Sequence, residues 1–210
     1  MPVKSERSVY GGSVPRVTEE YRAARREEIV EAALRVFRRK GFQAASMADI
    51  IAESGVSAGA IYGYFASKTE LVHQTASRIV GARVLDVEKL AASEPLPVPA
   101  EVVRVLMTGV QRELRDPRIL VQLWGEAMTD PALRELAAGV IDRILRTFED
   151  YLTVWHRNTN GHGETEAAAL AAEQAPLFVS ACQGCMLQSA LVEDFDRDGY
   201  LDLLVRYLPR

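Results

Sequence analysis

The spacing of apolar residues along the chain predicts an all-helical protein. From position 19 onward, apolar side chains recur at the three- and four-residue intervals that place them on one face of a helix. No segment alternates apolar and polar residues over the length of a β-strand. Ile29, Ala33 and Phe37 form the first such stripe, and they predict a helix over 19–40 that ends at a capping Gly41.

Signals for helix starts divide the rest of the chain. At five places an Asp or Ser stands where its side-chain oxygen can cap the free backbone N–H groups of a first helical turn. These are the capping-box patterns at 46–49 and 67–70, Ser57, and the Asp-Pro pairs at 116–117 and 130–131. The pattern predicts about nine helices, a proline-rich linker at 93–99, and a long helix over 164–192 that Pro176 kinks or divides.

Two short helices on either side of Gly55 have the pattern of a helix-turn-helix motif. Gly55 allows the backbone to turn sharply with a positive φ. Ile50, Val56 and Ile61 have the spacing needed to pack both helices against the stripe of the first helix. In such motifs the N-terminal end of the second helix enters the major groove of DNA.

Residues 25–71 resemble the DNA-binding domain of the tetracycline-repressor (TetR) family. The matching residues lie in one register at 41–42, 46–50, 55–62, 64–65, 67–68 and 70–71 (Gly-Phe, Ser-Met-Ala-Asp-Ile, Gly-Val-Ser-Ala-Gly-Ala-Ile-Tyr, Tyr-Phe, Ser-Lys and Glu-Leu). The resemblance implies a three-helix DNA-binding domain over 19–66. Glycines, prolines and the absence of periodicity before it predict a flexible arm at 1–18. It also implies a ligand-binding and dimerisation domain over 67–210.

The same resemblance implies a function. A homodimer would place two helix-turn-helix units on the half-sites of a palindromic double-stranded operator, and a small-molecule effector would release this repressor by changing the spacing of the units. The last two long helices would form the dimer interface. The residues implied in DNA contact are Arg25, Ser46, Ser57, Ala58, Gly59, Tyr62, Tyr64 and Lys68.

The predicted recognition helix is short of base-reading side chains. Between Ser57 and Gly63 there is no Arg, Lys, Asn or Gln, so the bidentate contacts that discriminate bases are absent there. We therefore expect sequence reading to depend on Tyr62, on apolar contact with thymine methyl groups, and on DNA shape. Arg25, Ser46, Tyr64 and Lys68 are expected to contact phosphates.

Large apolar side chains of the second domain are candidates for a ligand pocket between helices. Each of them also suits an ordinary core position, and the sequence leaves that choice open. The candidates are Met107, Trp124, Met128, Phe148, Trp155 and Phe178, with Gln122, Glu126 and Gln183 as polar members.

Charge is distributed unevenly along a chain whose formal net charge is −4. Residues 1–80 hold 12 Lys and Arg against 9 Asp and Glu, whereas residues 81–210 hold 13 against 20. A basic first third agrees with a DNA-contacting unit joined to one that does not touch DNA. The chain has no apolar run long enough for a signal peptide or membrane helix, so we expect a cytoplasmic protein with no membrane contact.

The two cysteines, Cys182 and Cys185, leave an alternative open. Their C-x-x-C spacing on a predicted helix suits either two small packed residues or a thiol pair that makes the protein a redox-sensing regulator. No second Cys pair or nearby His completes a zinc site, so we expect no metal and no cofactor. No catalytic constellation is present either, which argues against an enzyme, and the matching motif residues argue against a protein-binding module that has lost DNA binding.

Overall fold

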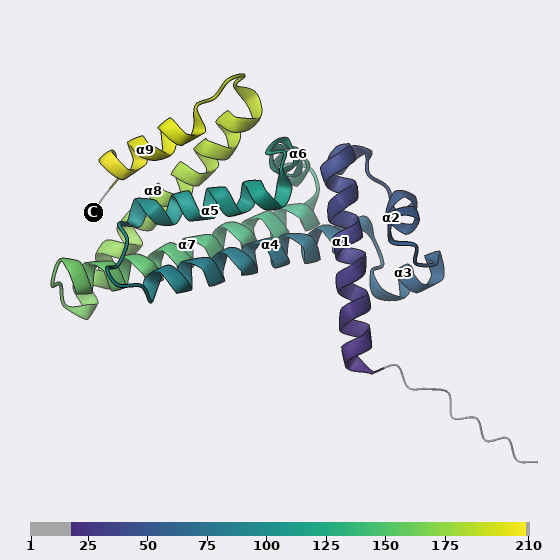
Figure 1. Cartoon of the computed structure of the whole chain (residues 1–210), viewed down its shortest axis with the longest axis horizontal. Coiled ribbons are helices and arrows are strands. Elements are labelled where there is room, and N and C mark those ends of the chain that lie inside the picture. Colours follow the sequence, from purple (N-terminus) through teal and green to yellow (C-terminus); the bar gives the residue numbers. More distant parts are fainter. Residues whose placement is uncertain (1–17, 209–210) are drawn as a thin grey trace, which may run out of the picture.

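The computed structural model describes residues 18–208, and these residues fold into nine α-helices without a β-strand (Figure 1). The all-helical prediction is confirmed. Of the expected arm at 1–18, residues 1–17 lie outside the described part. The helices are α1 (Glu19–Ala44), α2 (Met47–Ser54), α3 (Ala58–Tyr64), α4 (Lys68–Ala91), α5 (Pro99–Leu114), α6 (Arg118–Ala127), α7 (Pro131–Thr159), α8 (Glu164–Leu191) and α9 (Arg197–Tyr207).

The first three helices form a unit that we call the head. Helix α1 is interrupted at Gly41, whose φ of 75° and ψ of 171° suit glycine, so its regular part ends at Lys40 as predicted. Ile29, Ile50 and Ile61, one from each helix, are fully buried in the shared core of the head. The core of the head also takes in Ala127 and Leu133, which lie at the junction of α6 and α7.

Most of the predicted helix caps are present. Ser46 and Asp49 form a complete capping box at α2, Gly55 ends that helix in the left-handed conformation, and Ser57 caps α3. Asp130 accepts hydrogen bonds from the backbone N–H groups of Ala132 and Leu133 at the start of α7. Short-range signals therefore predicted these ends correctly, because all the partners lie within a few residues of one another.

Two predicted caps differ from the expectation. Ser67 caps α4 through the N–H of Glu70, but the carboxylate of Glu70 accepts the N–H of Ala66 at 2.7 Å, so the reciprocal half of the box is missing. The second is Asp116, since α6 begins one residue later than predicted and the N-cap position falls on Pro117. The Asp116 carboxylate instead binds both the backbone N–H and the guanidinium of Arg118.

Pro176 does not divide α8, which runs unbroken from Glu164 to Leu191. A proline inside a helix removes one backbone donor, here the one that would reach the carbonyl of Ala172. Ala171, Ala175 and Phe178 are nevertheless buried on one side of the helix, before and after the proline. Packing along this face compensates for the lost hydrogen bond and keeps the helix continuous.

The remaining helices form an elongated body beside the head (Figure 1). Helices α7 and α8 pack against each other along most of their length, and α4 lies along α7. Their core contains Phe148, Phe178 and Cys182 among its buried side chains. Helix α4 connects the two units, because it leaves the head at Lys68 and extends under the body to Ala91.

Charged side chains fasten α1 to the body. Arg78 of α4 forms ion pairs with Glu27, at 2.8 Å, and with Glu31 of α1. Arg38 of α1 donates to the backbone oxygen of Glu113 at the end of α5. The head is thus attached to α4, α5 and α6 through side chains on α1, so a shift of these body helices acts directly on α1.

Candidate functional site: the helix-turn-helix surface and an internal cavity

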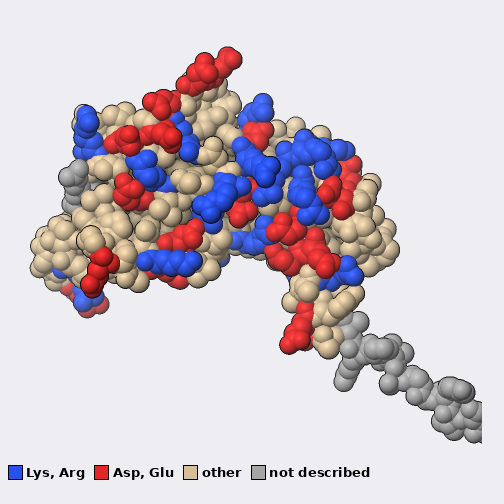
Figure 2. Space-filling model, in the orientation of Figure 1, with Lys and Arg blue, Asp and Glu red and all other residues tan. Residues whose placement is uncertain are grey.

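Helix α3 presents an exposed and uncharged surface. The Ser57 hydroxyl accepts the N–H of Ala60 at 3.4 Å, and the buried Ile61 anchors the helix to the core of the head. Ala58, Gly59 and Tyr62 face outward, with Tyr62 52% exposed. Figure 2 shows few charged side chains over α2 and α3. Small residues at the start of α3 let a second backbone, such as a DNA strand, approach closely.

Arg25 and Tyr64 occupy different environments. The Arg25 guanidinium lies on the exposed side of α1, where it pairs with Glu28 at 2.6 Å and with the hydroxyl of Tyr21 at 3.0 Å. A phosphate contact would have to replace Glu28. Tyr64 is half-buried against the core of the head at the end of α3.

Ser46 is engaged with Asp49 rather than free. Its hydroxyl donates to the Asp49 carboxylate at 2.8 Å, and Lys40 donates to the same carboxylate at 2.6 Å. Hydrogen bonds from Lys40, and next from Ser46, lower the pKa of Asp49 to about 2. A phosphate at this helix end would therefore approach an ionised carboxylate whose negative charge is balanced by the ammonium of Lys40.

Lys68 is the clearest departure from the predicted DNA contacts. Its ammonium donates to the backbone oxygens of Phe42 and Ala45, both at 3.0 Å, and lies 4.3 Å from the centre of the Phe42 ring. These carbonyls belong to the last turn of α1, after the bend at Gly41, and to its C-cap residue, where no helical partner is available to them. Lys68 thereby ties the start of α4 to the head, with two of its three N–H donors occupied inside the protein.

Arg26 was not predicted as a site residue, yet it contacts the C-terminal end of α3. Its guanidinium donates to the backbone oxygen of Tyr64 at 3.3 Å and lies 4.5 Å from the centre of the Phe65 ring. Glu70 of α4 is 3.8 Å away. Sequence reasoning missed this role, because these contacts span about forty residues and an Arg on a helix surface carries no local sign of them.

The folded head has no excess of positive charge. Residues 19–66 contain seven Lys and Arg and seven Asp and Glu. Arg35 and Arg39 both pair with Glu53, at 2.7 and 3.0 Å. Residues 1–80 have a net charge of +3. Because residues 19–66 contribute none of it, two of these charges come from residues 1–18 and one comes from residues 67–80. The head by itself therefore attracts DNA phosphates only modestly. Binding to DNA would depend more on DNA shape and on close contact between the protein and the DNA backbone.

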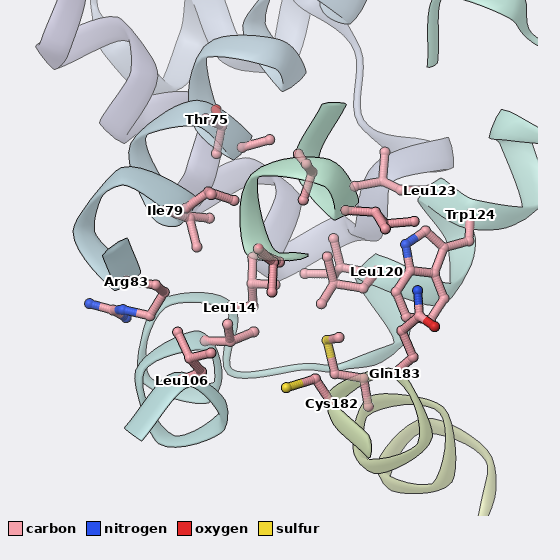
Figure 3. A pocket seen from close by; sticks show the side chains of 18 of the residues that line it. Thr75, Ile79, Arg83, Leu106, Leu114, Leu120, Leu123, Trp124, Cys182 and Gln183 are labelled. Atoms are coloured by element: carbon pink, nitrogen blue, oxygen red, sulfur yellow. The ribbon is translucent and has the colours of Figure 1, made fainter. Parts of the chain in front are cut away.

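An apolar cavity of about 130 Å³ lies between the head and the body (Figure 3). Six helices contribute to its wall: α1, α4, α5, α6, α7 and α8. Leu34 and Phe37 of α1 are part of the wall, so the cavity reaches the head directly. An occupant would touch α1, the helix against which α2 and α3 pack.

The structure places the predicted pocket residues in two groups. Met107, Trp124 and Gln183 line the cavity. The others lie elsewhere, and the prediction is corrected for them. Phe148 and Trp155 of α7 and Phe178 of α8 are buried but do not line the cavity. Met128 follows the last residue of α6 and is 71% exposed. Helical spacing identified these residues as apolar but could not show which interface each one would face.

Gln122 and Glu126 connect α6 to the head instead of lining the cavity. The side-chain oxygen of Gln122 accepts the N–H of Phe42 at 3.1 Å, next to the Gly41 bend. Glu126 accepts a hydrogen bond from the Gln43 side chain at 2.6 Å. Trp124, on the same helix, faces the cavity. Helix α6 is therefore a physical link between the cavity and the end of α1.

The cysteines are both free and buried, with 2% and 1% of their surfaces exposed. Burial raises the pKa of the Cys182 thiol, and it raises that of Cys185 as well. Reactive thiols need access to solvent and a lowered pKa, so these features favour a packing role. Among residues 18–208, no three His, Cys, Asp or Glu side chains are grouped as metal ligands. Over the same residues, no helix is long and apolar enough to span a bilayer.

A family model and several curated proteins match parts of the chain. Residues 29–75 match the family model of bacterial regulatory proteins, tetR family. An uncharacterised HTH-type transcriptional regulator, YfiR of Bacillus subtilis (strain 168), is 49% identical over 57 residues, which are 27% of this chain and 28% of that protein. The HTH-type transcriptional regulator AcrR of Shigella flexneri is 30% identical over 136 residues, or 59% of this chain and 62% of its own length.

Solved structures match over a longer stretch. A TetR transcription regulator from Haloarcula marismortui ATCC 43049 superposes with a TM-score of 0.72 over 89% of this chain and 97% of its own, at 14% identity. That likeness concerns the fold alone. The matches to curated relatives span between 28% and 62% of those proteins' lengths.

Proposed function

Since the chain belongs to the TetR family of transcriptional regulators, we propose that it is a homodimeric repressor that a small molecule releases from a palindromic operator. The observation that carries the proposal is the exposed N-terminal half of α3, which the Ser57 cap and the buried Ile61 hold outward. A helix presented in this way can enter a major groove.

The cavity supports the proposed control by a ligand. The wall of the cavity includes Phe37 of α1. Nearby on α1, the backbone N–H of Phe42 donates to the side chain of Gln122, which belongs to α6. A molecule that separates these helices would rotate or shift the head relative to the body. In a dimer this movement changes the spacing of two recognition helices, and a ligand that binds the changed conformation better reduces DNA affinity.

Exposed apolar residues on the last two helices support the proposed dimer. Leu177, Leu187 and Leu191 lie on one side of α8, at intervals of ten and four residues, and Leu203 and Tyr207 are exposed on α9. Exposed leucines that repeat along one side of a helix favour a surface that another chain covers. A second copy of the chain would cover it with its own α8 and α9.

The test is selection of random duplex DNA by the purified protein at physiological salt. We expect a palindrome whose half-sites lie about one to one and a half helical turns apart. Tyr62→Ala should change the selected sequence, because Tyr62 is the large exposed side chain of α3. Leu85→Ala, which alters an exposed apolar side chain of α4 away from the proposed DNA contacts, is the control. Failure to enrich any motif would contradict the proposal.

The alternative of a redox-sensing regulator finds no support in the geometry. Cys182 forms part of the apolar cavity wall, and its thiol is surrounded by protein. Oxidation that alters DNA affinity, and that Cys182→Ser or Cys185→Ser abolishes, would revive this alternative.

A further inference from the structure

Among residues 18–208, Arg83 is the one charged side chain on the wall of the cavity. It projects from α4, is 8% exposed, and lies at the opposite end of the cavity from Trp124 and Gln183 (Figure 3). Thr75 and Thr147, which also line the cavity, direct their hydroxyl groups to backbone oxygens of their own helices. An otherwise apolar cavity therefore has a single cationic end.

The Arg83 guanidinium lacks hydrogen-bond acceptors for most of its N–H groups. Its Nε and Nη1 atoms are buried and have no hydrogen-bond partner among the described residues. Asp86, one turn further along α4, lies 3.0 Å from Nε, but the geometry is not that of a hydrogen bond. The Asp86 side chain is 32% exposed and so remains partly in water. A buried cation in this state is costly unless an acceptor approaches it.

A glycine on the facing helix makes room for this cation. A Cβ atom at Gly109 of α5 would lie 2.3 Å from Nη1 of Arg83 and 2.5 Å from its Cζ. Glycine inside a helix is less favourable than alanine by about 1 kcal/mol. At position 109 it allows the guanidinium to lie directly against the α5 backbone, which holds it at the margin of the cavity.

From these observations we infer that the effector is a small carboxylic acid with an apolar body, whose carboxylate pairs with Arg83. This inference rests on the proposed function and names the chemistry of its ligand. A guanidinium offers parallel N–H groups that match the two oxygens of a carboxylate. One positive charge suits a monoanion, whereas a phosphate dianion would need further donors beside Arg83, and Trp124 and Gln183 lie at the opposite end of the cavity.

The volume of the cavity limits the apolar body. A dry apolar cavity of roughly 150 Å³ accommodates one benzene ring. The cavity of about 130 Å³ therefore suits a single ring or a short alkyl chain between Arg83 and Trp124. A larger acid would have to displace wall residues such as Trp124 or Leu120.

Calorimetric titration of the full chain with matched probes tests this inference. The probes are benzoate and hexanoate, each compared with its primary amide, which has a similar shape and no charge. We expect each acid to bind at least ~10-fold more tightly than its amide. In Arg83→Met this preference should disappear, because the acid loses affinity while the amide keeps it.

Two further variants separate a ligand role for Arg83 from a structural one. Asp86→Asn removes a carboxylate that competes for the guanidinium, so it should strengthen acid binding. Gly109→Ala keeps every charge but displaces the guanidinium, so it should weaken acid binding and leave amide binding unchanged. Thermal unfolding of each variant verifies that it is folded, and Arg83→Met should remain folded because it replaces a buried guanidinium, whose Nε and Nη1 have no hydrogen-bond partner, with an apolar side chain.

Several results would overturn the inference: equal affinity for acid and amide, an acid preference that survives in Arg83→Met, or no binding of any of the four probes. The titrations use protein without DNA. Their failure is therefore distinct from failure of the proposed function, which the DNA selection decides separately.

Discussion

Lys68 illustrates how the surroundings of a residue decide its role. Its type and its position at the start of α4 suit a phosphate contact, and the resemblance to TetR-family proteins implied one. In the structure its ammonium instead satisfies the oxygens of Phe42 and Ala45, which the bend at Gly41 leaves without helical partners. This lysine stabilises the connection between the head and α4 through two of its three N–H groups, and only the third is left for another partner.

Replacement of Lys68 by Met should therefore destabilise the protein. Hydrogen bonds from a charged donor contribute about 1.5–3 kcal/mol each, and partial exposure of Lys68 brings the expected loss to about 1–2 kcal/mol. Urea denaturation measures the change, and Lys89→Met, on the exposed side of the same helix, is the control. Unchanged stability together with a weaker salt dependence of DNA binding would restore the phosphate-contact role.

At the scale of the element, α2 shows how a short helix is held in place by its ends. It has eight residues, and an isolated helix of that length is unstable in water. The capping box between Ser46 and Asp49 satisfies its first N–H groups, and Gly55 satisfies the carbonyl of Ile51 at the other end. Lys40 binds the Asp49 carboxylate and so couples the capping box to the end of α1.

The low pKa of Asp49, about 2, predicts a specific pH dependence. The ionised carboxylate is favoured by folding, so its stabilising effect is present above the ordinary aspartate pKa of about 3.9. It is lost as the pH falls from about 4 through 2. Thermal unfolding at a series of pH values should show Asp49→Asn below the wild type at pH 7 and level with it near pH 2.

The exposed Glu88 provides the control for this measurement, and Glu88→Gln should follow the wild-type curve. A constant difference between Asp49→Asn and the wild type at every pH would show that the carboxylate charge does not stabilise α2.

For the whole molecule, the proposed function depends on two copies acting together. The exposed leucines of the proposed interface lie on α8 and α9, which belong to the body and not to the head. A head without net charge binds DNA weakly by itself, so joining two heads would raise the affinity through effective concentration. In such a dimer, α4 and α7 would connect the interface to each head.

Introduction of a charge into this surface should separate the two copies. Leu187→Glu places a carboxylate in the proposed interface, and we expect a monomer by sedimentation and an operator affinity reduced by at least ~100-fold. Leu85→Glu, at an exposed leucine of α4, is the matched control and should remain dimeric. A dimer that persists in Leu187→Glu would place the interface elsewhere.

Sequence alone determined the features that depend on neighbouring residues. The helices, the turn at Gly55 and the caps by Ser46, Ser57 and Asp130 were predictable, because each relies on apolar periodicity or on a partner within a few positions. The motif residues between 41 and 71 carried the family resemblance for the same reason, since they lie in one short register.

Tertiary structure decided which side chains meet across long separations. The attachment of Lys68 to Phe42, the bond of Gln122 to the same residue, and the placement of Arg83 against Gly109 join different helices. Periodicity shows that Phe148 and Met107 are both apolar, but only the packing of α5, α7 and α8 puts Met107 on the cavity wall and Phe148 outside it. The physical reason is that the hydrophobic effect has no direction, so it selects the residues that are buried without selecting their neighbours.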